Sequence, residues 1–579
     1  HHLDMVGVGG SSPLVSTISL NTFFICYSYP CMIKVYKAKS IITMNPSLPR
    51  AEAVAVRDGL ILETGSLDSM KPWLENNDYE IDEQFKDSII VPGLIDPHLH
   101  PSMAAVLLPT FFITAMEWKF PWGDTPATTS PEDYDSRLKE ALNNPTHKDI
   151  FITWGHHDLW HGPMSRSRLN KIEKNKPIVV WNRSFHELCM NDGALDYLGI
   201  TEDDVKGASQ IDFERGRFFE LGLGYAIQKL NPYILDPNKF KEGLIKLKEV
   251  VHYGGQTTIA DMAVGLFDFD NELNTQFELY ENDDTPFRVE LIAHATALIQ
   301  YAGGSNIKAE QLISELPERN THRLNFRKRV KLFTDGAFFA QVAQLMEPGY
   351  IDGHEGEWLS TPEQFEEVAR IYWNKGYAIH VHVTGDLGLE LAIDTLEILQ
   401  FEKPRFNHGF TLEHFGLSNP EQVHRLSKLG ANVSANAYYV HELSDLYANH
   451  TVGFERASSM SRIGSCFREG VTTSLHSDFT MAPAQPLMSM WVAVNRINEK
   501  GNLMSAEERL SPQQGMEAIT INAARVLGLD HEIGSIRAGK KADFTVLAQD
   551  PLEVDPMTIK DIKIEATLFE GKIFPISNR

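Results

Sequence analysis

Two histidines, His98 and His100, end an apolar run that reads I-V-P-G-L-I-D-P-H-L-H-P-S from Ile90 to Ser102. Side chains of a strand alternate between its two sides, so histidines at i and i+2 project together and can bind one metal ion. The three prolines of the run suit the ends of a strand, so we expect the pair where the strand opens into a loop. A solvent-exposed turn carries such a short pair equally well, so the pair alone leaves both interpretations open.

A lysine, Lys331, stands inside a second apolar run, R-V-K-L-F-T-D-G from Arg329 to Gly336. A buried ammonium without a partner is too unstable, so this lysine must be neutral, paired or chemically modified. A carbamate formed with carbon dioxide would make it an anionic ligand able to bridge two metal ions. The alternative is a lysine on the solvent-exposed edge of the strand, which spacing alone does not exclude.

Three further apolar runs end in groups that bind divalent cations. They read Y-A-I-H-V-H-V-T-G, F-T-L-E-H and V-T-T-S-L-H-S-D, and they supply His380, His382, His414 and Asp478. Active sites of α/β barrels gather at the carboxyl ends of the strands, so five such runs in succession predict one metal site. Imidazole and carboxylate ligands without thiolate favour zinc first, with manganese, nickel or iron as alternatives.

Composition and charge narrow the classes of partner. The chain has 579 residues with 53 basic and 78 acidic side chains, a formal charge of -25. Such a balance works against binding to nucleic acid or to an anionic membrane surface and favours a small-molecule substrate. Four cysteines form no paired framework, which indicates a reducing compartment and leads us to expect a cytoplasmic protein. No run approaches ~18 apolar residues, so we expect no membrane span.

The elements around these residues fall into two patterns. Alternating strands follow Ile33, with a hairpin turn at Asp58-Gly59, and similar short strands return after Gly534 and Ile564. These two ends of the chain are expected to share one β domain. Between them, apolar strand-like runs alternate with amphipathic stretches such as Pro362 to Lys375, which predicts a parallel α/β barrel.

The predicted organisation has three parts. Residues 1–31 begin with two histidines, as a purification tag does, and contain an uncharged stretch. No lysine or arginine precedes that stretch, as one would in a signal peptide, so these residues are taken as a tag or an extension outside the fold. Residues 33–90 and 530–579 are expected to form a composite β-sandwich domain. Residues 91–529 are expected to form a (β/α)8 catalytic barrel, with an insertion at roughly 105–210.

Together these motifs resemble the metal-dependent amidohydrolase superfamily, most closely its third family, the branch that includes N-substituted formamide deformylases. The resemblance rests on V-P-G-L-I-D-P-H-L-H, K-L-F-T-D-G, H-V-T-G-D, Glu413-His414, Ser477-Asp478 and the closing N-A-A-R-V-L-G-L and G-S-I-R-A-G-K-K-A-D-F. It covers nearly the whole chain from about Ile33. Two departures stand out. The family usually reads H-A-x-G-D after its fifth strand, where this chain reads H-V-T-G-D, and it usually has a glycine before the eighth-strand aspartate, where this chain has His476-Ser477.

The resemblance implies a (β/α)8 barrel beside a composite sandwich, with one or two divalent metal ions. Its first strand would supply His98 and His100, and its fourth would supply Lys331 as a carboxylated bridging lysine. The remaining ligands would come from the fifth, sixth and eighth strands: His382, His414 and Asp478. A homodimer is an option that the resemblance leaves open.

The expected chemistry follows from the metal. A divalent cation lowers the pKa of a bound water from about 15.7 to about 7 and polarises a carbonyl group. Asp478 is placed to take the proton of that water and pass it to the leaving atom. Glu413 and Asp386 lie beside proposed ligands and could orient their imidazole rings, or they could be surface carboxylates.

Substrate recognition is expected from the aromatic-rich stretch between Ala105 and about Gln210. Within it, Arg183 and His186 are the candidates for substrate binding, in a segment similar to one that the family brings near its active site. We therefore expect a hydrolase that cleaves an amide or related C–N bond of an N-acyl or N-formyl amine. The alternatives are a lactone or ester hydrolase, a metal-dependent isomerase on the same scaffold, and a non-catalytic metal-containing protein that binds a ligand.

Overall fold

Eight parallel strands form the central barrel of the protein. The computed structural model describes residues 32–143, 149–219 and 221–577. The strands follow one another around the barrel in chain order: β6 (Leu94–Leu99), β15 (Gln256–Val264), β16 (Arg288–His294), β17 (Leu324–Phe333), β18 (Ala378–Val383), β19 (Thr411–His414), β20 (Asn432–Ala435) and β21 (Thr472–Leu475). Most of their residues are buried, as parallel strands covered by helices require. The predicted barrel is therefore present.

The seam between the first and last strands is bridged just beyond their carboxyl ends. The backbone N–H of Asp478 donates to the carbonyl of His98 at 2.9 Å, and that of His100 donates to the carbonyl of Phe479 at 3.1 Å. These bonds draw the segment after β21 against the end of β6. Barrel closure thus brings together residues that lie about 380 positions apart in the chain.

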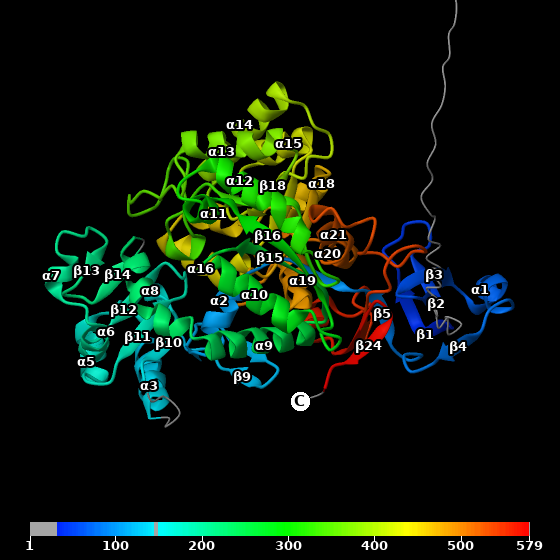
Figure 1. Cartoon of the computed structure of the whole chain (residues 1–579), viewed down its shortest axis with the longest axis horizontal. Coiled ribbons are helices and arrows are strands. Elements are labelled where there is room, and N and C mark those ends of the chain that lie inside the picture. The colour runs from blue at the N-terminus through cyan, green and yellow to red at the C-terminus, as the bar shows by residue number, and fades with distance from the viewer. Residues whose placement is uncertain (1–31, 144–148, 220, 578–579) are drawn as a thin grey trace, which may run out of the picture.

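Helices surround the barrel (Figure 1). Those that follow β15 to β21 are α10 (Phe269–Tyr280), α11 (Ala295–Tyr301), α12 (Asn306–Glu315), α13 (Pro362–Asn374), α14 (Asp386–Glu402), α15 (Pro420–Leu429), α16 (Tyr438–His450), α17 (Phe454–Ser458), α18 (Ile463–Arg468), α19 (Pro486–Asn495), α20 (Pro512–Ala518) and α21 (Ile521–Val526). The helix expected at Pro362 begins there, because the Thr361 side chain caps the backbone N–H of Gln364 and Gln364 caps Thr361 in return.

Strands from the two ends of the chain pair in one mixed sheet, at the right of Figure 1. Its members are β1 (Ile33–Ile42), β2 (Arg50–Arg57), β3 (Leu60–Gly65), β4 (Tyr79–Asp82), β5 (Ile89–Pro92), β22 (Phe544–Leu547), β23 (Ile564–Phe569) and β24 (Lys572–Pro575). The turn between β2 and β3 has φ of 54° at Asp58 and 76° at Gly59, as a two-residue hairpin requires. The shared sheet is established, whereas the two-layer sandwich stays a prediction, and the interpretation of residues 1–31 lies outside the described residues.

A second sheet lies at the other side of the barrel, at the left of Figure 1. It runs in the order β13 (Ile211–Asp212), β14 (Arg217–Phe219), β12 (Glu187–Met190), β11 (Ile178–Asn182), β10 (Phe151–His156) and β7 (Phe111–Phe112). Between the first and second barrel strands also lie α2 (Pro101–Leu107), α3 (Pro131–Leu142), α4 (Asp158–His161), α5 (Arg166–Ile172), α6 (Asp192–Leu198), α8 (Leu221–Ile234) and α9 (Pro237–Tyr253). This connection separates the first barrel strand from the other seven.

The strand that carries the first histidine differs from the expectation in one detail. Pro97 lies inside β6 rather than at its end, and the pairing register of β6 with β15 shifts between Ile259 and Asp261. A proline has no N–H for the ladder, so a shift in register at this place accommodates it. The apolar run from Ile90 also divides at Gly93, so that β5 joins the terminal sheet and β6 enters the barrel.

In the ranges that the structure describes, no helix combines the length and the apolar character needed to cross a lipid bilayer.

Candidate metal centre

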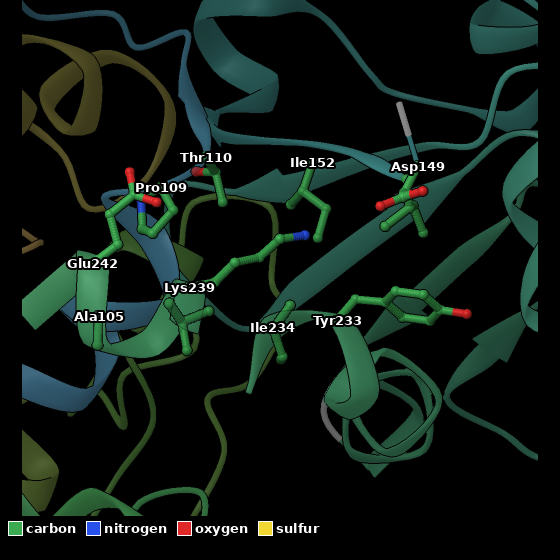
Figure 2. A pocket seen from close by; sticks show the side chains of 11 residues that line it. Ala105, Pro109, Thr110, Asp149, Ile152, Tyr233, Ile234, Lys239 and Glu242 are labelled. Atoms are coloured by element: carbon green, nitrogen blue, oxygen red, sulfur yellow. The ribbon is translucent and has the colours of Figure 1, made fainter. Parts of the chain in front are cut away.

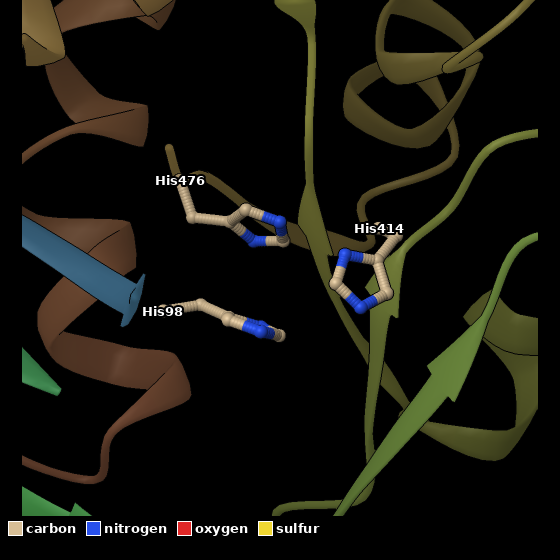
Figure 3. Close-up of side chains that lie close together, drawn as sticks. All are labelled: His98, His414 and His476. Carbon is tan, nitrogen blue, oxygen red and sulfur yellow. The ribbon is translucent and has the colours of Figure 1, made fainter. Parts of the chain in front are cut away.

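Four imidazole rings and one carboxylate meet at the carboxyl ends of the first, sixth and eighth barrel strands. The Nε2 atoms of His98 and His100 lie 3.3 Å apart, and Asp478 Oδ1 lies 3.5 Å from the first and 3.0 Å from the second. The ring centroids of His98, His414 and His476 are separated by 4.4 to 5.2 Å, and the three rings lie close together (Figure 3). Two groups of three potential metal ligands result, namely His98–His100–Asp478 and His98–His414–His476.

A buried carboxylate, Glu413, holds two of the surrounding rings. Its Oε2 accepts a hydrogen bond from Nδ1 of His98 at 2.8 Å, and its Oε1 accepts one from Nδ1 of His380 at 2.6 Å. Nδ1 of His476 lies 3.5 Å from the same carboxylate. A carboxylate that accepts one ring N–H fixes the tautomer and leaves the other nitrogen available for a metal ion. Glu413 is thus buried and orients the rings of His98 and His380, rather than that of its neighbour His414.

Several buried nitrogen atoms around this centre lack a hydrogen-bond partner among the described residues. They are His100 Nδ1, Lys331 Nζ, His380 Nε2, His382 Nε2, His414 Nδ1 and His476 Nε2. Buried polar atoms nearly always have partners, so a concentration of unpartnered ones indicates a place where a ligand binds. Neutral imidazole nitrogens beside a carboxylate, without thiolate, fit zinc or a similar divalent cation.

Burial keeps the histidines of this centre neutral. Desolvation holds the pKa of His98, His414 and His476 well below the usual range, and the nearby positive charge of Lys331 lowers each further. Desolvation also lowers the pKa of Lys331 itself, to about 8. Neutral imidazole is the form that binds a metal ion, so the electrostatics suit ligation.

The loop that carries Asp478 is fixed by a carboxylate that sequence reasoning missed. Asp96 accepts hydrogen bonds from the backbone N–H and the hydroxyl of Ser477, and burial raises its pKa to about 7. Asp478 and His414 have φ of 53° and 70°, in the left-handed region that residues other than glycine rarely adopt. Such strain gathers at functional sites. Asp96 lies two residues before His98 on the same strand, and this i, i+2 spacing was the available signal.

The other two predicted ligands, Lys331 and His382, come from β17 and β18. Lys331 is fully buried and pairs in register with His294 on one side and His380 on the other. His382 faces His414 with a ring-centroid distance of 4.5 Å. Both side chains thus lie on the wall of the same centre, and their roles as ligands stay predictions.

Arg183 and His186, the predicted substrate-binding residues, lie in different surroundings. Arg183 is buried and donates to both carboxylate oxygens of Glu442, at 3.2 and 2.9 Å, and to the backbone carbonyl of Met481. His186 lines a cavity of about 350 Å³ between the second sheet and the loop after β17. A charge on His186 would also lower the pKa of His382, so His186 lies within electrostatic reach of the centre. Their binding of a substrate stays a prediction.

A separate cavity of about 460 Å³ lies outside the barrel, between α2, β10, α8 and α9 (Figure 2). Lys239, Glu242 and Tyr233 are among its lining residues, and none of the histidines described above is. It therefore offers no route to the candidate metal centre.

Asp386, the other carboxylate expected to orient an imidazole, has different partners. Both of its oxygens accept hydrogen bonds from Arg456, at 2.9 and 2.8 Å, and Oδ1 accepts another from the backbone of Met346. Asp386 therefore anchors the loop after β17. Unlike Glu413, it makes no hydrogen bond to a ring of the centre among the residues that the structure describes.

Several known proteins are similar to this chain over most of its length. The N-substituted formamide deformylase of Arthrobacter pascens is 24% identical over 536 residues, which cover 90% of this chain and 94% of that protein. The Arabidopsis thaliana protein LONG AFTER FAR-RED 3 is 25% identical over 523 residues, covering 88% and 86%. The crystal structure of an uncharacterized metal-dependent hydrolase from Pyrococcus horikoshii shares the fold, with a TM-score of 0.68 at 21% identity, over 90% of this chain and 99% of that one.

The sequence profile of the amidohydrolase family matches residues 86–575, which include the whole barrel, the second sheet and four of the eight strands of the terminal sheet. With its barrel, its strand-end histidines and this match, the chain belongs to the amidohydrolase family.

Proposed function

We propose that the protein is a metal-dependent hydrolase that cleaves the C–N bond of a small N-acyl or N-formyl amine. One observation carries the proposal: Asp478 lies 3.0 Å from His100 and 3.5 Å from His98, close to histidines with buried nitrogens that have no hydrogen-bond partner among the described residues. A carboxylate in that position can bind a proton beside a metal ion. The name of the Arthrobacter relative supports an N-formyl substrate.

The residues that would hold the cation are His98, His100, Lys331, His382, His414 and Asp478, with zinc as the expected metal and Lys331 as a carbamate. A bound divalent cation supplies a water of lowered pKa and polarises the substrate carbonyl. Asp478 takes the proton of the attacking water and returns it to the leaving nitrogen. Glu413 holds the His98 ring through Nδ1 and thereby presents Nε2 to the centre.

Walls of the site exclude bulk water from this proton transfer. His98, His414 and Asp478 are each at most 6% exposed, so the proton held by Asp478 passes to the substrate rather than to solvent.

Metal content and product formation test the proposal together. We expect the purified protein to hold one to two equivalents of zinc per chain and to release formate and a free amine from N-formyl amines. In Lys331→Ala, the metal content should fall below half of the wild-type value, because a buried anionic ligand is lost. Inductively coupled plasma mass spectrometry of the dialysed protein measures the metal content.

Lys540→Ala is the matched control, because Lys540 is also a buried lysine but donates to Ser535 at 2.7 Å and to backbone carbonyls far from the centre. Its metal content should equal that of the wild type. A wild-type protein without metal after reconstitution with zinc would contradict the proposal, and release of acid without amine would favour an ester or lactone substrate.

Glu413→Gln should weaken metal binding without removing a ligand. The amide keeps the shape of the side chain, but as a neutral group it no longer attracts the ring N–H groups of His98 and His380 as a carboxylate does. Loss of such an outer partner lowers metal affinity by about 10- to 100-fold, which competition with a chelator measures. Glu508→Gln removes another buried carboxylate, which binds Ser465 away from the histidines, and should leave the affinity unchanged.

A further inference from the structure

His476 is a buried histidine that the proposed function does not use. It follows β21 directly and is 1% exposed. Its ring centroid lies 4.4 Å from that of His98, with the two rings tilted by 35°, and 5.2 Å from that of His414. Figure 3 shows the three rings arranged around a common point.

One nitrogen of His476 is engaged and the other is available. Nδ1 lies 2.8 Å from the hydroxyl of Ser434 and 3.5 Å from Glu413 Oε2. A ring N–H directed at these oxygens leaves the lone pair of the neutral ring on Nε2. Nε2 is buried and has no partner within the described part of the chain.

The same division of roles holds for the two neighbouring rings. His98 donates from Nδ1 to Glu413 and keeps Nε2 for the centre. His414 Nδ1 is buried and has no hydrogen-bond partner among the described residues, and it lies 3.5 Å from Asp478 Oδ2. His414 and His476 thus each have one nitrogen without a partner among the described residues, whereas Nε2 of His98 lies 3.3 Å from Nε2 of His100.

We propose that His476 is a metal ligand, which together with His98 and His414 forms a three-imidazole site for a zinc-like divalent cation. The inference rests on the proposed function, because it concerns the same metal centre. Three imidazoles can hold a catalytic zinc ion, so His476 would join the ligands proposed above, and Asp478 would keep its role as the base.

The dimensions fit such a site. Zn–N distances of about 2.0–2.1 Å in a tetrahedron separate the ligand nitrogens by roughly 3.3 Å. In the structure one ligand atom from each of the three histidines lies within 4.8 Å of the other two.

The test compares metal binding by the wild type, His476→Gln and His476→Gly. Zinc affinity is measured by competition with a chelator, and ligation is followed through the visible absorption of the cobalt(II)-substituted protein. If His476 is a direct ligand, its substitution should lower the zinc affinity by more than about 100-fold, which is beyond the range for a residue that only hydrogen-bonds to a ligand. Both variants should change the cobalt spectrum, and added imidazole should restore it in His476→Gly.

His408→Gln is the matched control. His408 is a buried histidine whose nitrogens are both engaged, Nε2 with the carbonyl of Leu429 at 2.9 Å and Nδ1 with the backbone N–H of Phe410 at 3.0 Å. Its loss should leave both the affinity and the spectrum unchanged.

The outcomes separate the two proposals. If the wild type binds metal and both His476 variants bind it with unchanged affinity and spectrum, His476 is not a ligand, while the proposed function stands. If affinity falls less than 100-fold and the spectrum is unchanged, His476 only positions its neighbours and the inference is wrong. If the wild type itself binds no divalent cation, the proposed function fails first.

Discussion

Asp478→Asn is expected to lower kcat by about 10²- to 10⁴-fold, the range typical for the loss of a general acid–base group. Asparagine has the same shape as aspartate but does not accept a proton near neutral pH. The backbone bond from residue 478 to the carbonyl of His98 does not depend on the side chain, so the local fold should persist. Metal content should therefore stay within twofold of the wild-type value while turnover falls.

The measurement is kcat for hydrolysis of an N-formyl amine, together with metal content of the same preparation. Asp386→Asn serves as a control, since Asp386 is a buried carboxylate that Arg456 holds by two hydrogen bonds. That variant should lose stability rather than turnover. If Asp478→Asn kept wild-type turnover, another group would be the base. Exchange of substrate protons with solvent, without release of an amine, would identify an isomerase.

The barrel and most residues of the centre were predictable from the sequence because parallel strands impose a simple geometry. Carboxyl ends of the strands meet on one face of a barrel, so polar residues that end apolar runs converge there whatever the details of packing. His98, His100, His414 and Asp478 follow this rule, and the structure brings them together. The hairpin at Asp58-Gly59 was predictable for a similarly local reason.

Side-chain partners were less predictable, because they depend on how distant segments meet. Glu413 was expected to orient the ring beside it, but it binds His98, which is 315 positions away in the chain. His476 stood out in the sequence as an unusual residue, yet only barrel closure places its ring against those of His98 and His414. Asp96 was missed because its partner, Ser477, lies 381 positions away.

Arg183 shows the same limit most clearly. An arginine in a loop near an active site suggested a substrate-binding group, but the sequence does not reveal that α16 brings Glu442 against it. The two side chains are each 2% exposed and are joined at 2.9 Å. The guanidinium also lies 4.3 Å from the ring centroid of Phe339, so it is packed on several sides.

Arg183→Met is expected to destabilise the protein by about 3–5 kcal/mol, the range for removing one partner of a buried ion pair. Without the arginine, Glu442 is left as an uncompensated buried carboxylate. Burial already raises the pKa of Glu442, and Arg183 opposes that rise, so the carboxyl should take up a proton more readily in the variant. The loss of stability in Arg183→Met should therefore be smaller below the raised pKa of Glu442, where the carboxyl is neutral, than at higher pH. The midpoint of thermal unfolding, measured between pH 5 and 8, tests both points.

The double variant Arg183→Met/Glu442→Met should recover most of the lost stability, since replacing both partners by apolar groups removes the unpaired charge. Arg370→Met is the surface control; Arg370 pairs with Glu402 at 2.9 Å near solvent, and exposed pairs contribute only about 0.2–1 kcal/mol.

Turnover separates the roles of Arg183 further. Arg183 also donates to the carbonyl of Met481, three residues after Asp478. We therefore expect Arg183→Met to lower kcat, and we expect kcat to remain lowered in the double variant although that variant is stable. A raised KM with unchanged kcat and stability would instead show that Arg183 binds the substrate, and would contradict a role in holding the Asp478 loop.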